Sequence, residues 1–351
     1  MTQPAILALA THVPPDRYSQ DDIYDQIAQL GLDTDPRARK IFENAGVGFR
    51  HAVVNGLYFS EERTTQERNS CYLSEAIPLG EETIRRCLDA AGCRADEVDD
   101  LIVVSCTGID TPGLDLQLAG RLGMRPDLRR TTILGMGCYA AFPGLGRARD
   151  AASVSADRTV LVLTIELCSL HLQMDDSLEN IVSAALFADG AAAALIGQKN
   201  GHNNGAPMPR MVDAATHCDY NTLEHMAFRL TDHGFQMRLS AYVPDLLAAE
   251  IEGFIDHLLS QNHLGREDVR FWGVHPGSGK ILDHVQARLS LTDDQMVCSR
   301  NILHRYGNMS SATILFVLDA LQRTGHPRPG DYGVLMAFGP GLTMESMLVQ
   351  W

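Results

Sequence analysis

The composition of the chain excludes several classes of protein before any motif is considered. The 351 residues include 29 Lys+Arg and 44 Asp+Glu, which gives a formal net charge of −15 at pH 7. Nucleic-acid-binding proteins usually carry a basic excess because phosphate contacts dominate their affinity, so this class is disfavoured. Hydrophobic residues make up 45% and charged residues 21%, which is typical of a globular protein with a large core.

The cysteines and the apolar runs indicate the cellular compartment of the protein. The eight cysteines form no CxxC pair and no CxxH spacing, which disfavours a zinc site. The N-terminus lacks a charged segment followed by an apolar one, and no apolar run reaches the roughly 18 residues of a spanning helix. We therefore expect a cytoplasmic protein with reduced thiols, no bound metal and no stable membrane insertion.

Short apolar runs alternate with segments of helical period along most of the chain. Residues 13–70, which are rich in charge, are predicted to form a helical elaboration at the N-terminus. The runs at 101–104, 159–165, 191–196 and 333–338 are rich in Val, Ile, Leu and Ala and predict buried strands. Strands that alternate with helices predict an α/β protein built in layers.

An internal repeat divides the chain into two halves. Residues 74–105 predict an amphipathic helix, a short acidic turn and a strand, and residues 246–275 predict the same order. Val98 and Val269 hold equivalent places in the two copies. A repeat of this length predicts two copies of one α/β unit that pack about a pseudo-twofold axis. The alternative is that the two segments look alike only because α/β segments in general share this pattern.

The expected halves are residues 1–200, which include the helical elaboration, and residues 211–351. A turn-rich stretch at 198–210 separates them.

Cys138 is the first candidate for chemistry. It follows a predicted strand at 131–137 and precedes a predicted helix. Backbone N–H groups at the start of a helix lower the pKa of a thiol and favour the nucleophilic thiolate. A lone cysteine is more often a small buried hydrophobic residue, so the case for Cys138 depends on this position.

His275 and Asn308 are the candidates in the second half. His275 ends a predicted strand, where the active-site groups of α/β units gather. Asn308 stands before a helix at nearly the place that Cys138 has in the first half, and an asparagine there also serves as a helix cap. If the halves face each other, these three residues share one pocket. The imidazole and the amide would then stabilise the thiolate and donate hydrogen bonds to an oxyanion or enolate.

The order cysteine, histidine, asparagine is also that of papain-like cysteine hydrolases. In that family the cysteine lies near the mature N-terminus in a CGSCW-like context, which GMGCYAA at 135–141 does not match. The duplicated α/β pattern is also unlike that family, so a cysteine hydrolase is disfavoured.

Six motifs resemble the thiolase-fold condensing enzymes and, within them, the chalcone-synthase-like type III polyketide synthases. The motifs are CTGIDTPG (106–113), GCYAAFPGL (137–145), ALFADGAAA (185–193), HPGSGKIL (275–282), YGNMSSA (306–312) and GPGLTMES (339–346). The likeness runs from about residue 5 to the C-terminus. It implies a homodimer whose chains each form a five-layer αβαβα sandwich of two thiolase-like halves.

The resemblance implies a role for each matching residue. Cys138 would be the acyl-carrying nucleophile and would form an ion pair with His275. His275 and Asn308 would bind the malonyl thioester carbonyl, so that loss of CO2 leaves a stabilised enolate that attacks the Cys138 thioester. Phe187 matches the aromatic gate between the CoA tunnel and the cavity, and Pro340 matches the loop of the cavity floor. The substrates would be acyl-CoA and malonyl-CoA, with no cofactor and no metal.

The resemblance also implies a basic mouth for the CoA tunnel. The matching residues are Arg37 and Lys40, with Arg39 between them, whereas one further basic position of the family is Asn44 here. Because CoA is polyanionic and the chain carries −15, we expect CoA binding to depend on this local basic mouth.

Specificity is expected where the sequence departs from the plant enzymes of the family. Met237 replaces a cavity aromatic, two residues after Phe235, and the residues Cys106, Thr111 and Cys168 stand at cavity positions that are usually Thr or Met. A flexible methionine and small side chains favour a thin aliphatic acyl starter, and hence an alkylpyrone or alkylresorcinol product. Cys106 equally suits a tetrahydroxynaphthalene-type synthase that uses malonyl-CoA alone. Neutral packing changes would explain the same residues.

Two further alternatives share the Cys, His and Asn residues. A ketoacyl-ACP synthase III condenses once and stops, but it typically lacks the GPGLT signature at 339–343. An inactive relative that serves as a scaffold conflicts with an intact set of three residues.

Overall fold

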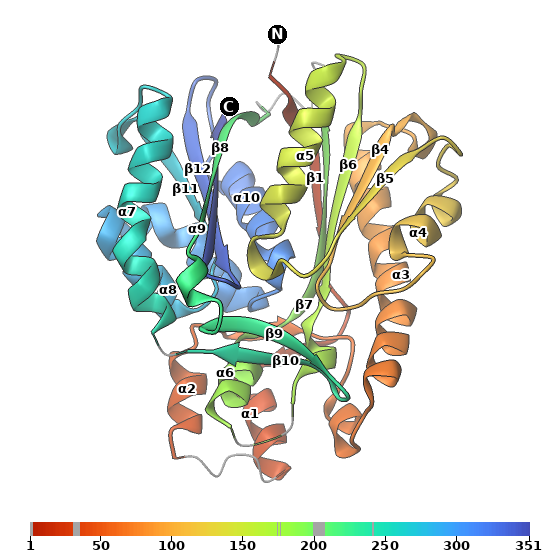
Figure 1. Cartoon of the computed structure of the whole chain (residues 1–351), viewed down its shortest axis with the longest axis vertical. Coiled ribbons are helices and arrows are strands. Elements are labelled where there is room, and N and C mark those ends of the chain that lie inside the picture. The colour runs from red at the N-terminus through yellow and green to blue at the C-terminus, as the bar shows by residue number, and fades with distance from the viewer. Residues whose placement is uncertain (1–2, 31–35, 174, 176, 199–207, 241) are drawn as a thin grey trace.

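A nine-stranded sheet runs through the described part of the molecule in the order β11-β12-β13-β8-β1-β7-β6-β4-β5 (Figure 1). The computed structural model describes residues 3–30, 36–173, 175, 177–198, 208–240 and 242–351. The strands of the sheet are β1 (Ala5–His12), β4 (Asp100–Val104), β5 (Arg129–Ile133), β6 (Val160–Leu167), β7 (Asp189–Gly197), β8 (Arg210–Cys218), β11 (Val269–Val274), β12 (Tyr332–Gly339) and β13 (Thr343–Gln350).

The sheet has an N-terminal part and a C-terminal part. They meet between β1 and β8, which share one paired position, Ala5 with Arg210. The strands predicted from apolar runs are confirmed as β4, β6, β7 and β12. β6 is buried at all eight residues, because its sequence VLVLTIEL is apolar almost throughout and helices cover both faces.

Helices form the other three layers of the sandwich. α5 (Ala141–Val154) and α10 (Thr313–Thr324) lie in the middle and share one core with both parts of the sheet. α3 (Thr65–Ala91) and α4 (Leu114–Leu122) cover the outer face of the N-terminal part. α7 (Val243–Gln261) and α8 (Gly279–Leu289) cover the C-terminal part. The predicted αβαβα sandwich is confirmed (Figure 1).

The internal repeat is visible as equivalent elements. The 3₁₀ turns η2 (Ala95–Glu97) and η6 (Arg266–Asp268) precede β4 and β11, and both follow a long outer helix. The order α3, β4, α5, β6, β7 in the first half corresponds to α7, β11, α10, β12, β13 in the second. The copies differ before the central helix, where the first half has the strand β5 and the second has the helix α9 (Asp293–Tyr306).

The N-terminal elaboration is only partly helical, which corrects the prediction for residues 13–70. It contains α1 (Gln20–Gln29) and α2 (Ala38–Asn44), but also the antiparallel pair of β2 (Arg17–Ser19) and β3 (Phe49–His51). Strands of three residues are too short to show a period of two. The elaboration lies at the lower end of the molecule in Figure 1, together with α6 (Leu178–Leu186) and the hairpin of β9 (Met226–Thr231) and β10 (Gly234–Leu239).

None of the helices that the structure describes is both long enough and apolar enough to span a membrane.

Candidate active site

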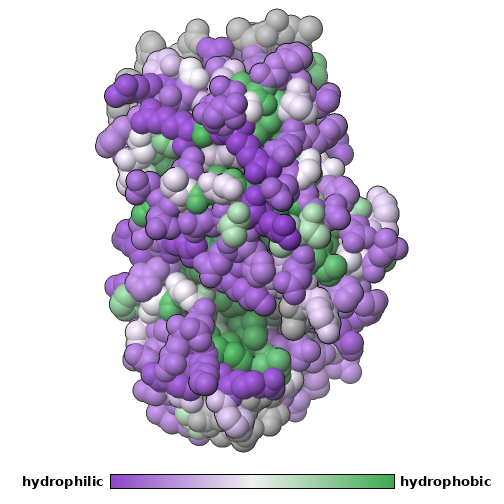
Figure 2. All heavy atoms as spheres, turned by 90° about the vertical axis from the view of Figure 1, so that its left-hand side faces the viewer, coloured by the Kyte–Doolittle hydropathy of each residue, from purple (hydrophilic) through white to green (hydrophobic). Residues whose placement is uncertain are grey.

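A cavity of about 320 Å³ opens where α2, α6, the hairpin β9–β10 and the first turns of α7 and α8 come together. Cys138, His275 and Asn308 all line it. Figure 2, in which the left-hand side of Figure 1 faces the viewer, shows an apolar hollow in the lower part of the molecule, surrounded by hydrophilic residues. The structure therefore brings the three candidate residues to one cavity from distant parts of the sequence.

Cys138 lies in the 3₁₀ turn η3 (Gly137–Tyr139), directly before the central helix α5. The strand predicted for residues 131–137 ends earlier, at Ile133. Gly137 has φ +72°, which glycine adopts readily, and a Cβ there would meet Pro340 Cδ at 2.8 Å. Pro340 also lines the cavity, so its loop packs directly on the turn that carries the thiol.

Burial is the dominant influence on the Cys138 thiol. It raises the pKa of Cys138 to about 11, while Ser310 and Asn308 oppose part of that rise through hydrogen bonds. The predicted lowering by backbone N–H groups is present as a backbone hydrogen bond at Cys138, but desolvation outweighs it, so the net shift of this pKa is upward. A thiolate here needs a positive partner beside it.

His275 follows β11, and its backbone N–H donates to Met336 O of β12 at 2.8 Å. It is 1% exposed, and neither Nδ1 nor Nε2 has a hydrogen-bond partner among the residues that the structure describes. Burial lowers the pKa of His275 to about 3. Because burial disfavours each charge separately, an ion pair with Cys138 would require the proton to pass from thiol to imidazole, so that both charges form together.

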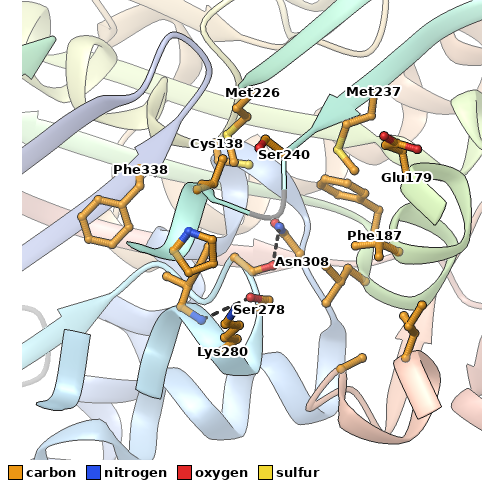
Figure 3. A pocket seen from close by; sticks show the side chains of 18 of the residues that line it. Cys138, Glu179, Phe187, Met226, Met237, Ser240, Ser278, Lys280, Asn308 and Phe338 are labelled. Atoms are coloured by element: carbon orange, nitrogen blue, oxygen red, sulfur yellow. Dashed lines mark hydrogen bonds between the residues drawn. The ribbon is translucent and has the colours of Figure 1, made fainter. Parts of the chain in front are cut away.

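The orientation of the Asn308 amide is fixed by two neighbours. Oδ1 accepts from Ser310 N at 2.9 Å, and Nδ2 donates to Gly277 O at 3.2 Å. An amide nitrogen has two hydrogens, so one remains available on the side of the Cys138 thiol, whose pKa Asn308 lowers. Figure 3 shows Asn308 and Cys138 at the middle of the cavity wall.

Phe187 and Met237 form the wall behind the thiol. Together with Cys138 and Cys168 they make one buried cluster. A smaller chamber of about 30 Å³ lies behind them, and its lining includes Phe187, Met237, Phe235, Cys106 and Cys168. The structure thus brings the predicted gate and four of the five predicted cavity residues to the cavity or to this chamber.

Thr111 is the predicted cavity residue that the structure places elsewhere. It is exposed in the loop before α4, preceding the cis peptide bond to Pro112. The loop places this side chain outside the cavity of its own chain. Thr111 stands at a position that lines the cavity in the plant enzymes, but that correspondence did not predict where the side chain lies in this protein.

The basic mouth also differs from the sequence prediction. Arg37 and Lys40 are exposed and do not line the cavity, whereas Ile41 and Asn44 of the same helix do. Arg37 and Lys40 each lie four residues before one of these, so they extend the same side of α2 by about one turn, or ~5.4 Å. Arg39 is engaged in ion pairs with carboxylates of α1 and α2.

Lys280 is a basic residue of the mouth that the sequence reasoning missed. It lies in the first turn of α8 and lines the cavity. Ser278 caps this helix by accepting from Ile281 N, and Gly279 N donates to Ala45 O at 3.3 Å, so the positive end of the helix and a lysine meet at the same place. Lys280 stands within the HPGSGKIL motif, five residues after His275. This closeness in sequence to a candidate site residue could have indicated that Lys280 lies at the cavity.

Glu166 is a second residue that the sequence reasoning passed over. It is the penultimate residue of β6 and is fully buried. It accepts hydrogen bonds from Cys106 N at 2.9 Å and Thr107 Oγ1 at 3.0 Å, and also from the Ser311 hydroxyl. Burial raises the pKa of Glu166, and these hydrogen bonds oppose that rise. Its charge raises the pKa of the Cys106 and Cys138 thiols, so it disfavours any thiolate that lacks the imidazolium.

Two thiolase-like halves that bring a cysteine, a histidine and an asparagine to one apolar cavity define a condensing enzyme of the thiolase fold. The family models for chalcone and stilbene synthases match most of the chain, the N-terminal domain over residues 54–200 and the C-terminal domain over residues 211–351. The chain therefore belongs to the chalcone and stilbene synthase family, and it is a type III polyketide synthase, an acyltransferase.

Similar proteins from bacteria cover nearly the whole chain. A 1,3,6,8-tetrahydroxynaphthalene synthase of Streptomyces peucetius subsp. caesius is 36% identical over 350 residues, with 99% of this chain and 93% of the relative covered. The alpha-pyrone synthesis polyketide synthase-like Pks18 of Mycobacterium tuberculosis is 29% identical over 357 residues, covering 99% and 91%. The crystal structure of the tetrahydroxynaphthalene synthase of Streptomyces coelicolor A3(2) superimposes with a TM-score of 0.92 at 28% identity, covering 99% of each chain.

Proposed function

We propose that Cys138, His275 and Asn308 carry out the condensation in this cavity. An acyl-CoA enters with its thioester at Cys138, and the Cys138 sulfur attacks the carbonyl carbon. The thiol proton passes to His275, and the CoA thiolate leaves with a proton from the imidazolium. The acyl group then remains on Cys138 as a thioester.

The second step uses the same donors on malonyl-CoA. His275 and the Asn308 N–H that faces Cys138 donate to the malonyl thioester carbonyl, the carbon–carboxylate bond breaks and CO2 leaves. The electron pair forms an enolate whose oxygen the two donors stabilise. The enolate carbon attacks the carbonyl carbon of the Cys138 thioester, and the carbon–sulfur bond to Cys138 breaks. The chain, now two carbons longer, is held as a CoA thioester, and the Cys138 thiolate is regenerated. Transfer of the chain back to Cys138 releases CoA and permits the next round, and cyclisation at the end gives an alkylpyrone, an alkylresorcinol or a related phenolic product.

The observation that carries this proposal is the pair of unpartnered nitrogens on His275. A buried imidazole without hydrogen bonds is costly, so its neighbours are expected to come from a ligand. The fixed Asn308 amide and the Cys138 thiol line the same cavity as these nitrogens. Incubation with acyl-CoA and malonyl-CoA tests the proposal, because the absence of CO2 and of any extended product with every starter would contradict it.

The mouth of the cavity is the proposed CoA site, and Lys280 is expected to matter most there. Lys280→Ala should raise the KM for acyl-CoA about 10-fold with little change in kcat, because a charged donor to phosphate contributes roughly 1.5–3 kcal/mol. The double substitution Arg37→Ala/Lys40→Ala should raise KM less, because both residues lie about one turn further out on α2. Steady-state kinetics of the variants measures both effects, and an unchanged KM in Lys280→Ala would place the phosphates elsewhere.

The size of the chamber behind Phe187 bears on the starter. About 30 Å³ is room for two or three water-sized groups, so a long aliphatic chain enters only if Met237 moves. This observation supports a second candidate function beside the first, a synthase that uses malonyl-CoA alone; the relative of 36% identity is named a 1,3,6,8-tetrahydroxynaphthalene synthase.

Met237 is therefore expected to limit the length of the starter. Met237→Ala should open the wall between the cavity and the chamber and shift product formation toward longer acyl-CoA starters. Met226→Ala is the matched control, because Met226 lines the cavity but not the chamber. A panel of acyl-CoAs with mass spectrometry of the products measures the shift, and equal product profiles in the two variants would contradict it.

A homodimer is proposed from the edge of the sheet. β5 is an edge strand whose first four residues are exposed, and Leu116, Leu134 and Met136 near it are also exposed. An open edge beside exposed apolar side chains is suited to pairing with a second copy. Light scattering at micromolar concentration should give twice the 38.4 kDa of one chain, and a monomer at all concentrations would contradict this.

A cytoplasmic location is also proposed. All eight cysteines are free thiols in the structure, and free thiols are usual in a reducing compartment.

A further inference from the structure

Arg50 of β3 is a buried charge that the proposed chemistry does not use. Its side chain is 2% exposed. Nη1 donates to Phe187 O at 3.0 Å and to Ala184 O, and Nη2 donates to Ala185 O at 2.9 Å and to Gln20 Oε1. The guanidinium therefore holds the carbonyl groups at the C-terminal end of α6, directly before the gate residue.

The physical chemistry of this contact is that of a helix C-terminus. The last carbonyls of a helix have no partners within it and carry partial negative charge. A guanidinium offers five donors in a planar fork, which suits several carbonyls at once. Burial lowers the pKa of Arg50 to about 9, opposed by the Asp189 carboxylate, so the residue stays charged at neutral pH.

The end of α6 is in turn joined to Asn308. The Asn308 N–H donates to Leu186 O at 2.9 Å, and Ala188 N–H donates to Asn308 O at 3.0 Å. These two hydrogen bonds form an isolated bridge between Phe187 and Asn308. The backbones of the gate and of the proposed enolate-binding amide are therefore joined directly, and Figure 3 shows both side chains in the wall of the same cavity.

Arg50 also packs close to the residue before Asn308. Gly307 has φ +72°, and a Cβ at this position would lie 3.0 Å from Leu186 O and 3.5 Å from Arg50 Cβ. The close approach leaves no room for Asn308 to shift toward α6 while Arg50 holds the helix end in place.

We propose that Arg50 is a positioning residue that sets the places of Phe187 and Asn308 together. The inference rests on the proposed function of Asn308 in the malonyl step. Loss of the guanidinium would leave the helix end without its donors, and the Asn308 amide would shift with it. The backbone of Cys138 is held from another side, by η3, α5 and the Pro340 loop, although its thiol also forms hydrogen bonds with Ser310 and Asn308. Loading of the starter should therefore survive a change at Arg50, whereas decarboxylation of malonyl-CoA should not.

The test compares Arg50→Gln and Arg50→Lys with Arg68→Gln. Arg68 is the matched control because it is also buried, at 5% exposed, and donates to the carbonyls of Arg63, Leu170 and Leu172. Each substitution to Gln removes a buried guanidinium from backbone carbonyls, but only the one at Arg50 affects the bridge to Asn308. Two rates are measured on each folded variant, acylation of Cys138 by intact mass and CO2 release from malonyl-CoA.

Arg50→Gln should acylate at nearly the wild-type rate and release CO2 about 100-fold more slowly, because a displacement of about 1 Å at a reacting group can cost that much. Arg50→Lys should recover part of the CO2 release, since it keeps the charge but offers fewer donors. Arg68→Gln should not separate the two rates. An equal fall of both rates in Arg50→Gln, or no fall in CO2 release, would overturn the inference.

A milder variant keeps the inference testable if Arg50→Gln does not fold. Gln20 accepts from Arg50 and donates from Nε2 to Ala185 O at 3.0 Å, so Gln20→Met weakens the same contact without removing a buried charge. It should slow CO2 release selectively, and an equal fall of both rates would again overturn the inference. If the wild-type protein itself is not acylated, the proposed function fails and the failure does not concern Arg50.

Discussion

Replacing Cys138 with alanine should abolish acylation and product formation while leaving some decarboxylation of malonyl-CoA. The substitution removes the sulfur that carries the chain, and loss of a nucleophile lowers turnover by on the order of 10⁴-fold or more. His275 and the Asn308 amide remain, so the donors for the enolate oxygen are still in place. Intact mass after incubation with acyl-CoA and CO2 release from malonyl-CoA measure the two halves of this prediction.

Cys168→Ala is the matched control for this variant. Cys168 is a second buried thiol of the same cluster, and burial also raises its pKa well above the usual range. It should keep both acylation and CO2 release. Retained covalent labelling in Cys138→Ala would remove Cys138 as the nucleophile.

Replacing Asn308 with aspartate should impair CO2 release more than acylation, which is the opposite of the effect expected for Cys138→Ala. The change keeps the shape of the side chain but removes the N–H donor and adds a negative charge where the enolate forms. Removal of one such donor costs about 10²–10³-fold in rate, so CO2 release should fall at least this far. Acylation of Cys138 should fall less than CO2 release, because the variant loses the hydrogen bond that lowers the pKa of the thiol but keeps the Cys138 sulfur and His275 for the loading step.

Asn180→Asp provides the comparison for Asn308→Asp. Asn180 is equally buried, at 3% exposed, but it lines the small chamber and not the cavity. CO2 release should therefore fall much less in this variant. Wild-type CO2 release in Asn308→Asp, or a loss of acylation in the same proportion, would show that the two steps do not divide between these residues as proposed.

The part of the fold that could be predicted from sequence is the part with one dominant periodicity. β4, β6, β7 and β12 are buried on both faces, so their apolar runs are continuous. The edge strand β5 reads RRTTI and is largely exposed, and its predicted range was therefore displaced toward the more apolar ILGMG. The short pair β2–β3 has no detectable period, which explains why the elaboration was predicted as helical.

The candidate site also has residues that the sequence could predict and residues that it could not. Cys138, His275 and Asn308 are marked by their places at the ends of strands and the starts of helices, and the fold brings them together. Thr111 and Lys280 depend on the direction in which a loop or a first helical turn points a side chain, and no residue pattern records that direction. Arg50 acts through backbone carbonyls of a helix 134 residues away in the sequence, so its role becomes visible only in three dimensions.

The measurement that tests the central claim most directly is the intact mass of the wild-type protein after incubation with acyl-CoA, followed by peptide mapping. The proposed chemistry predicts one acyl group on the peptide that contains Cys138, with release of CoA, and its conversion to extended products when malonyl-CoA is added. No acyl adduct, or an adduct carried by Cys106 or Cys168 instead, would contradict it.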